Sequence, residues 1–189
     1  MPPKPKFTKE TIAEVALNIV KEQGVASLTA RELGKKLGVS STPIFTIFEN
    51  MDEVKDYARK IGLQEFEAYV GDIRNYKPAF KRIGMQMVSY AIHQPEVFKM
   101  IYMHEQIECQ SFDELIKDLG DMVGICIELI QQDYNLTAEK AKRLFEVMWV
   151  YTFGISSMCA MKVCDFSEEE IEHRLGQVFN GMVMIIKDE

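Results

Sequence analysis

Residues 29–48, TARELGKKLGVSSTPIFTIF, constrain the fold more than any other stretch of this 189-residue chain. Counted from Ala30, five apolar positions have the spacing that packs two crossed helices against each other. These positions are Leu33, Leu37, Val39, Ile44 and Ile47. Gly38 falls where the turn between the helices requires a positive φ, and Gly34 is small where the helices cross. The pattern predicts a helix-turn-helix.

Capping residues mark where the two helices of this motif would begin. Thr29 is placed to cap the first helix, and Glu32, three residues later, can complete a capping box. Ser40 is placed to cap the second helix. The outer face of that second helix would be free to enter a major groove, so double-stranded DNA is the first partner to consider.

Helical patterns also flank the motif on both sides. Upstream, a helical apolar stripe ends at Gly24 and consists of Ile12, Val15, Ala16 and Ile19. Downstream, Asn50 and Glu53 form another capping box and predict a helix over residues 51–69. These patterns predict a three-helix N-terminal module followed by a longer helix.

Composition and charge narrow the class of protein. Hydrophobic residues make up 47% of the chain and charged residues 27%, which is typical of soluble globular proteins. Helical stripes recur and strand signals are scarce, so we expect an all-α fold. The net charge is −7, yet residues 1–60 carry ten basic and eight acidic residues. This asymmetry fits a DNA-contacting head on an acidic body.

Other signals argue against secretion, a membrane and metal chemistry. The N-terminus MPPKPKF lacks the apolar run of a secretory signal, and the longest uncharged stretch, residues 147–161, is shorter than a membrane span. We expect a cytoplasmic protein without membrane contact. The cysteines have no CxxC spacing and are expected to be reduced core residues; they are Cys109, Cys126, Cys159 and Cys164. No catalytic motif appears, so we expect no enzyme activity, cofactor or metal.

Two long amphipathic helices are predicted at the C-terminus. Thr137 is a candidate N-cap for the first, and Ser167, with Glu170 as its box partner, begins the second. Such an antiparallel pair can bury one face in its own domain and the other against a second copy.

The middle of the chain and the first of these two helices are rich in Met and aromatic residues. Met is flexible and polarizable, so these residues suit a cavity for a small apolar effector. An ordinary hydrophobic core is the alternative for each of them. The candidate ligand-binding residues are Met85, Tyr90, Phe98, Met103, Met122, Met148, Trp149 and Phe153.

The order of motifs in the first 60 residues resembles the N-terminal domain of the tetracycline-repressor (TetR) family. The residues that carry the resemblance are Gly24, Leu28, Thr29, Arg31, Leu33, Gly38, Val39, Ser40, Phe45, Phe48 and the helix after Asn50. The resemblance implies a DNA-binding domain over residues 1–50 and a ligand-sensing and dimerization domain over residues 51–189. It also implies a homodimer through the last two helices, with candidate interface residues Ile155, Cys159, Leu175, Val178, Phe179 and Met182.

The candidate DNA-binding residues lie in the motif and in a basic N-terminal arm. Arg31 matches a family position that commonly contacts DNA, and its guanidinium can bind phosphate or a guanine edge. The complete candidate set is Lys4, Lys6, Lys9, Thr29, Arg31, Lys35, Ser40, Ser41, Thr42, Pro43, Phe45 and Thr46. Together with these residues, the resemblance implies a ligand-responsive regulator, with repression as the expected sign, that binds a near-palindromic operator as a homodimer.

The sequence also leaves a second function open. Residues 40–48 contain no Lys, Arg or His, and Phe45 and Met51 stand where the family usually has Tyr and Lys. Phosphate attraction normally supplies much of the affinity for DNA. The alternative is therefore a TetR-like coactivator or protein-binding regulator with weak or no DNA binding of its own.

Overall fold

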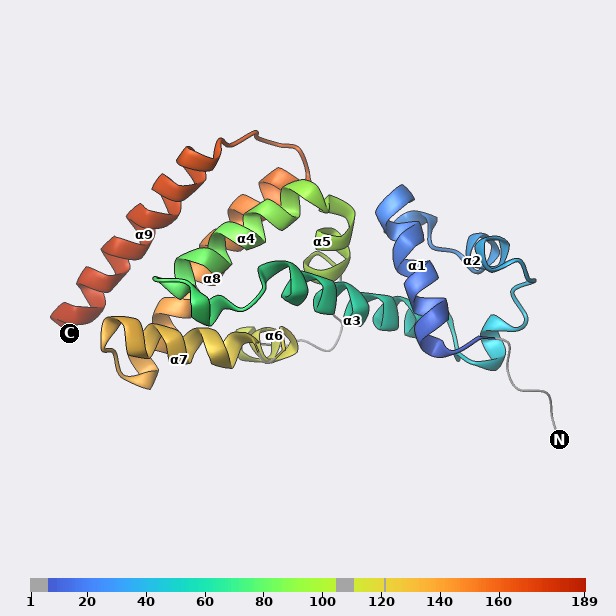
Figure 1. Ribbon diagram of the computed structural model, residues 1–189, viewed down its shortest axis with the longest axis horizontal. Helices are drawn as coiled ribbons and strands as arrows, with labels where there is room; N and C mark the ends of the chain where they lie inside the picture. The colour runs from blue at the N-terminus through green and yellow to red at the C-terminus, as the bar shows by residue number, and fades with distance from the viewer. Residues whose placement is uncertain (1–6, 105–110, 121) are drawn as a thin grey trace. The chain divides into compact units, whose positions relative to one another are not determined.

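The computed structural model describes residues 7–104, 111–120 and 122–189, and this part of the chain consists of helices, turns and loops without a strand (Figure 1). The expectation of an all-α fold is confirmed. The α-helices are α1 Lys9–Gln23, α2 Ala30–Leu37, α3 Met51–Val70, α4 Ala79–His93, α5 Pro95–Tyr102, α6 Phe112–Asp118, α7 Met122–Tyr134, α8 Ala138–Ala160 and α9 Glu168–Asp188. Short 3₁₀ helices cover Val25–Ser27, Ile44–Thr46 and Ile73–Asn75.

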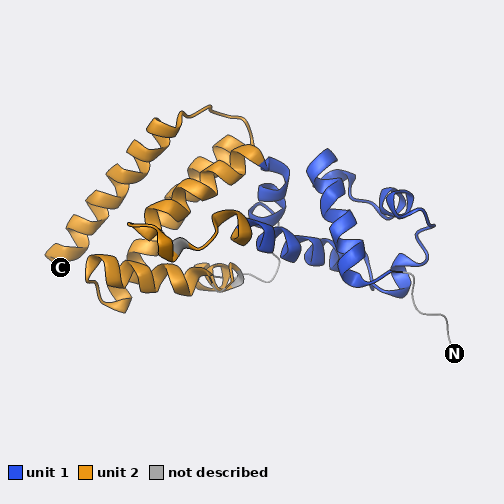
Figure 2. Ribbon diagram, in the orientation of Figure 1, with its two compact units in different colours: residues 1–66, 94–104 blue, residues 67–93, 105–189 orange. Residues whose placement is uncertain are grey.

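The chain forms two compact units (Figure 2). Unit 1 holds residues 1–66 and 94–104, and unit 2 holds residues 67–93 and 105–189. Helix α3 begins in unit 1 and ends in unit 2, and α5 belongs to unit 1 although its neighbours in sequence belong to unit 2. The chain therefore passes between the units three times.

Unit 1 is built around α1, which ends at Gly24 as predicted. Gly24 has a φ of 80°, and its N–H donates to the carbonyl of Val20 at 2.8 Å. The apolar face of α1, including Ile12 and Ile19, is fully buried and contacts α2 and α5. Burial of this face supplies the hydrophobic stabilisation of the unit.

Helix α5 packs closely against α3 within unit 1. A side chain on Gly62 would lie 3.2 Å from Val97, so the glycine permits the two helices to approach. The guanidinium Nε of Arg59 donates to the carbonyl of Ile101 at 3.2 Å, and the rings of Phe66 and Tyr102 meet edge to face. These contacts explain why α5 belongs to the unit that contains the helix-turn-helix.

Unit 2 is a bundle in which α8 contacts α4, α7 and α9. The predicted N-caps of the two long helices are confirmed, because Thr137 accepts from Lys140 N–H at 3.3 Å and Ser167 from Glu170 N–H at 3.1 Å. The Glu170 side chain does not close a capping box, since it binds Arg174 instead. The core of this unit includes buried residues of α4, α8 and α9, among them Met87, Leu144, Met148, Ile155 and Leu175.

The cysteines differ in their surroundings. Cys126 is buried in α7, and burial raises the pKa of its thiol to about 12. Cys159 is partly buried, and desolvation raises its pKa as well. The expectation of core cysteines is wrong for Cys164, which is exposed in the loop between α8 and α9. Cys109 lies outside the described residues.

Among the described residues, no helix has the length and apolar character needed to cross a bilayer.

Candidate nucleic-acid interface and pocket

The turn after α2 has the geometry that the sequence predicts. Gly38 has a φ of 69°, in the left-handed region that favours glycine, and its N–H donates to the carbonyl of Lys35 at 3.2 Å. The N–H of Val39 donates to the carbonyl of Gly34 at 2.9 Å. A Cβ on Gly34 would lie 2.8 Å from the carbonyl oxygen of Val39, so this position has no room for a side chain.

The second element of the motif is shorter than the predicted helix over residues 40–48. Only Ile44–Thr46 forms a helical turn, and it is a 3₁₀ turn. Pro43 has no N–H to donate, and the hydroxyl of Thr46 donates to its carbonyl at 2.7 Å. The N–H of Ile47 bonds the carbonyl of Ile44 instead, at 3.0 Å. Residues 40–48, which we call the turn segment, thus contain one 3₁₀ turn in place of the predicted helix.

The turn segment separates buried anchors from an exposed outer face. Ile44 and Phe48 are each 1% exposed and fix the segment to unit 1. Phe45 is 43% exposed. The other predicted DNA-contacting residues here are Ser40, Thr42 and Thr46, which are exposed, and Ser41 and Pro43, which are half-buried. The predicted reading residues thus share one short segment, although its backbone differs from the expected helix.

Helix α2 presents its basic residues to solvent. Arg31 is exposed and forms no ion pair with any described residue. Lys35, with a side chain 76% exposed, lies 3.6 Å from Glu32. Thr29 acts as the predicted N-cap, because its hydroxyl accepts from the N–H of Glu32 at 3.2 Å. Its own N–H donates to the carbonyl of Ser27 rather than to Glu32, so the capping box is only half formed.

Lys9, predicted to belong to a basic arm, is a half-buried residue that contacts other residues of unit 1. Its ammonium pairs with Glu53, the residue that the Asn50 cap places in the first turn of α3. It also lies 5.1 Å from the Phe48 ring centroid and 5.0 Å from that of Tyr57. The hydrogen bond with Glu53 raises the pKa of Lys9 and lowers that of Glu53. Lys4 and Lys6 lie outside the described residues.

A second ion pair within unit 1 links α1 to α2. Lys36 lies 2.7 Å from Glu22, and this hydrogen bond lowers the pKa of the glutamate. Sequence inspection alone misses both this pair and Lys9–Glu53, because their partners are separated by 14 and 44 positions. The two pairs partly neutralise lysines that would otherwise be available to phosphates.

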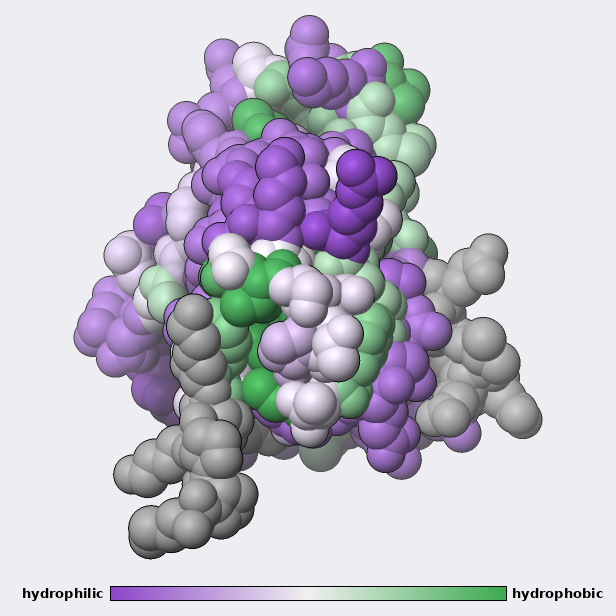
Figure 3. Space-filling view, turned by 90° about the vertical axis from the view of Figure 1, so that its right-hand side faces the viewer, coloured by the Kyte–Doolittle hydropathy of each residue, from purple (hydrophilic) through white to green (hydrophobic). Residues whose placement is uncertain are grey.

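One part of the outer surface of unit 1 carries few charged side chains. Figure 3 shows green hydrophobic atoms beside pale, near-neutral atoms on a face of this unit. Among the described residues of unit 1, Phe45 and Met103 are the exposed large hydrophobic side chains. A surface of this kind can make apolar contacts as well as hydrogen bonds from hydroxyl groups.

The structure distributes the candidate ligand-binding residues over both units. Phe98 is fully buried and Met103 is exposed, and both belong to unit 1. In unit 2, Trp149 and Phe153 stack with ring centroids 5.3 Å apart, and Phe112 meets Trp149 edge to face. Tyr90 and Met148 are buried in unit 2, whereas Met85 and Met122 are half-buried. Two of the candidates thus belong to unit 1 and the other six to unit 2.

Unit 2 also buries polar side chains that the sequence patterns do not single out. Ser156 is fully buried, and its hydroxyl has no hydrogen-bond partner among the described residues. Gln86, 9% exposed, accepts from the Nη1 and Nε atoms of Arg82 at 2.7 and 2.9 Å when its amide oxygen faces the guanidinium. A buried hydroxyl is costly unless it is bonded, so Ser156 is a candidate polar contact for a small molecule.

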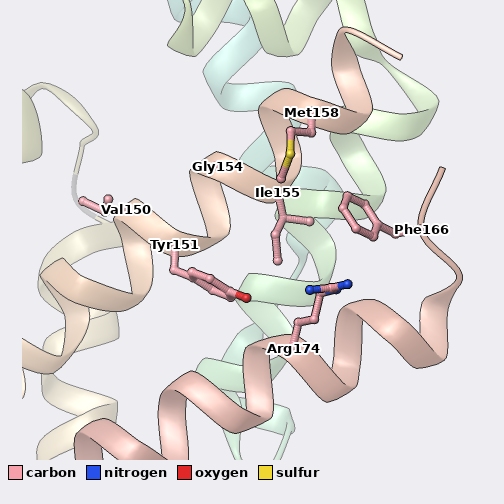
Figure 4. A pocket seen from close by; sticks show the side chains of 7 residues that line it. All are labelled: Val150, Tyr151, Gly154, Ile155, Met158, Phe166 and Arg174. Atoms are coloured by element: carbon pink, nitrogen blue, oxygen red, sulfur yellow. The ribbon is translucent and has the colours of Figure 1, made fainter. Parts of the chain in front are cut away.

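A pocket of about 230 Å³ lies between α8, α9 and the loop that joins them (Figure 4). Arg174 and Tyr151 point toward each other in it, and Glu170 accepts from Arg174 Nη2 at 2.6 Å. The hydrogen bond to Glu170 raises the pKa of Arg174. The pocket is lined by Val150, Tyr151, Gly154, Ile155, Met158, Phe166 and Arg174, none of which is a candidate ligand-binding residue.

The candidate dimer residues are largely covered within their own unit. Ile155 and Leu175 are buried because α8 and α9 pack them against the rest of unit 2, and the Phe179 ring contacts those of Phe80 and Tyr134. Cys159, Val178 and Met182 are half-buried. The exposed large apolar side chains of the two helices are Val150, Met184 and Ile185, and Met161, which directly follows α8, is exposed as well.

Comparison with known proteins gives structural but not sequence matches. No protein-family model and no curated protein sequence matches the chain. A transcriptional regulator from Rhodococcus sp. RHA1 has a TM-score of 0.71 and 15% identity, covering 94% of this chain and 97% of its own. A TetR variant from Acinetobacter baumannii AYE in complex with minocycline has a TM-score of 0.66 and 16% identity, covering 96% and 99%.

BioQ in complex with its natural double-stranded DNA operator has a TM-score of 0.58 and 13% identity, covering 95% of this chain and 99% of its own. Each similarity therefore extends over nearly the whole of both chains. The chain has the fold of the TetR family of transcriptional regulators.

Proposed function

We propose that this protein is a DNA-binding transcriptional regulator that acts as a homodimer and responds to a small molecule. The turn after α2 carries the proposal, because Gly34 and Gly38 hold an exposed segment next to the exposed Arg31. Similarity in fold to an operator-bound protein supports it. Repression is the sign of regulation that we propose.

Binding to DNA would begin with the turn segment and α2. In a two-fold dimer, two such segments enter successive major grooves about 34 Å apart, so the operator is a near-palindrome. Arg31 supplies a charge that no described residue neutralises, and its guanidinium binds phosphate or a guanine edge. Lys35 adds a weakly paired, exposed charge on the same helix.

The small molecule would bind in unit 2, and we propose an apolar effector. The stacked rings of Trp149 and Phe153 and the buried Met148 supply apolar contacts, while Ser156 supplies an unbonded hydroxyl. The minocycline complex of a structural neighbour supports a ligand in a protein of this fold. The shift that such a molecule causes is limited by its differential affinity for the two states of the regulator.

The coupling is tested by measuring effector affinity with and without operator DNA. Linkage requires that an effector which weakens DNA binding is itself bound more weakly by the DNA complex, by the same factor. We expect a ratio of about 5 to 150, the usual range for allosteric coupling. Equal affinities in the two titrations would exclude the proposed response to a ligand.

Assembly into a homodimer through α8 and α9 is the remaining part of the proposal. The exposed apolar residues on these helices are the observation that supports it, since unpartnered apolar side chains favour burial against another surface. Met184 is the most exposed of them, at 68%. We therefore place the contact on Val150, Met184 and Ile185, with Val178 and Met182 beside them.

A second function is favoured by the chemistry of the turn segment. Phe45 is exposed, and the segment carries no cation. Lys9 and Lys36 are held in ion pairs with other residues of unit 1. Such a surface also suits contact with another protein. Arg31→Ala discriminates between the two functions, because only the DNA-binding function requires a large loss of operator affinity in this variant.

A further inference from the structure

The turn segment has an unusual set of exposed groups for a surface that reads DNA. Guanine is usually recognised by Arg or Lys, and adenine by Asn or Gln, through paired hydrogen bonds in the major groove. Residues 39–48 contain none of these four residue types. Any base preference that this segment has must come from hydroxyl groups or from apolar contact.

The hydroxyl of Thr46 has already used its only donor. It donates to the carbonyl of Pro43 at 2.7 Å, and the residue is exposed. The side chain can therefore offer a partner its methyl group and the acceptor lone pairs of Oγ1, but it cannot donate a hydrogen bond to a base while this bond is kept.

Phe45 adds a larger apolar group next to Thr46. Its side chain is 43% exposed, and the ring makes no aromatic or cation–π contact with any other described residue. Ile44 and Phe48 are buried on the opposite side of the turn, so the segment cannot rotate to cover Phe45 without exposing them. An exposed aromatic ring held by buried neighbours is a preorganised apolar contact.

We propose that the turn segment recognises the C5-methyl groups of thymine, with Phe45 and Thr46 as the residues that determine specificity. The thymine methyl is the apolar group that a base pair presents in the major groove, and Thr methyl and Phe are side chains that contact it. This inference rests on the proposed DNA-binding function. It predicts operator half-sites with A·T pairs at the positions that face the turn segment.

Glu49 and the hydroxyls of Ser40 and Thr42 do not supply an alternative preference for guanine. The carboxylate of Glu49 only accepts hydrogen bonds, so it disfavours the acceptor edge of guanine and the nearby phosphates. Hydroxyl groups donate to or accept from any base and discriminate weakly among them. Arg31 and Lys35, on α2, are exposed side chains of unit 1 that can bind guanine, and their roles are separable from that of the turn segment by mutation.

The experiment begins with selection of bound sequences from a random duplex pool by the full-length protein. Thymines in the enriched half-site are then replaced one at a time by uracil, which removes only the C5-methyl group. We expect about a fourfold loss of affinity at each thymine that contacts the turn segment, as for one buried methyl group. Thymines outside the half-site serve as the control and should be insensitive.

Two variants of Thr46 assign the methyl contact to this residue. Thr46→Ser keeps the hydroxyl that bonds Pro43 and removes the methyl, whereas Thr46→Val keeps a methyl and removes the hydroxyl. We expect Thr46→Ser to weaken binding to thymine DNA and to have no further effect on the uracil-substituted site. The DNA affinity of Thr46→Val should still fall when uracil replaces thymine at that position.

5-Methylcytosine provides an independent test, because it carries a methyl group at the same ring position with a different hydrogen-bonding edge. At a position where uracil weakens binding, the protein should bind DNA with 5-methylcytosine more tightly than DNA with cytosine. Affinities that do not respond to uracil or to cytosine methylation at any half-site position would overturn the inference while leaving DNA binding intact. Selection that enriches no sequence would overturn both this inference and the proposed function.

Discussion

Arg31 is the single residue on which the proposed DNA affinity depends most. It is exposed, and no described residue competes for its guanidinium. Lys9 and Lys36, by contrast, are positively charged residues of the same unit whose ammonium groups are held by Glu53 and Glu22. Charge that is already paired is less available to a phosphate, so counting basic residues in the sequence overestimates the attraction.

We expect Arg31→Ala to lower operator affinity by about tenfold or more and to reduce the slope of log affinity against log salt by about 1. Arg31→Lys is the matched variant, because it keeps the charge and removes the planar fork. Restored affinity in Arg31→Lys indicates a phosphate contact, and continued loss indicates a guanine contact. Wild-type affinity in Arg31→Ala would contradict a role for this residue in DNA binding.

Gly34 is the residue on which the geometry of the turn depends. A Cβ at this position would lie 2.8 Å from the backbone oxygen of Val39, and backbone cannot move as easily as a side chain. We expect Gly34→Ala to destabilise the protein by about 1–3 kcal/mol, the cost of overpacking. Gly124→Ala, in α7 with open space around the new methyl, is the control and should not lower stability. Equal thermal melting of the two variants would refute this account of the turn.

The turn segment could be predicted from the sequence only in part. The spacing of Leu33, Gly38 and Ile44 correctly predicts the motif, because buried apolar positions and a positive φ leave a clear pattern. The same pattern does not predict that residues 40–48 form only a short 3₁₀ turn. Apolar periodicity marks which positions are buried, and it does not report the backbone hydrogen bonds that decide between a 3₁₀ turn and an α-helix.

The link between α1 and α3 is a contact that periodicity cannot predict either. Glu53 accepts from the N–H of Glu49 at 2.7 Å and also pairs with Lys9, which lies 44 positions away. The predicted capping box places the Glu53 carboxylate on the N–H of Asn50, whereas the structure has it on the N–H of Glu49, one residue earlier. The pair with Lys9 depends on how the helices pack, so the sequence pattern predicts only a basic arm for Lys9.

Acidification should remove the contribution of this ion pair. The bond from Lys9 lowers the pKa of Glu53, so its stabilisation is present above the ordinary carboxyl pKa and is lost as the pH falls through the lowered value, below about pH 4. Glu53→Gln keeps an acceptor for Glu49 N–H and removes the charge. We expect the variant to be less stable than wild type at pH 7 and the difference to shrink toward pH 3.

Denaturant titrations at several pH values measure this difference directly. Glu14→Gln, which neutralises an exposed carboxylate with no ion pair among the described residues, is the matched control and should change stability little at any pH. A difference between wild type and Glu53→Gln that is independent of pH would show that the ion pair does not link α1 to α3 in solution.

The proposed regulator requires two copies of the chain. Sequence patterns predict the two long C-terminal helices, and the structure confirms their caps. The patterns could not separate residues that face the interior of unit 2, such as Ile155 and Leu175, from residues that face outward, such as Met184 and Ile185. All of them are apolar, and only packing decides which side is covered.

We expect Met184→Glu to convert a homodimer to a monomer, because a carboxylate buried in an apolar interface loses its hydration. Sedimentation at matched protein concentration measures the change. Gln132→Glu adds the same charge at an exposed position of α7 and should leave the assembly unchanged. A Met184→Glu protein that stays dimeric would place the interface elsewhere, and a monomeric wild type would contradict the proposed assembly.

Binding of the full-length protein to the DNA sequences it selects, followed over a salt series, decides whether the protein is a DNA-binding regulator. We expect specific binding whose salt dependence is shallow for a protein of this kind, because Lys9 and Lys36 are held in ion pairs within unit 1 and the turn segment carries no cation. No specific binding at low salt in the absence of effector would contradict a DNA-binding regulator and favour the protein-binding function.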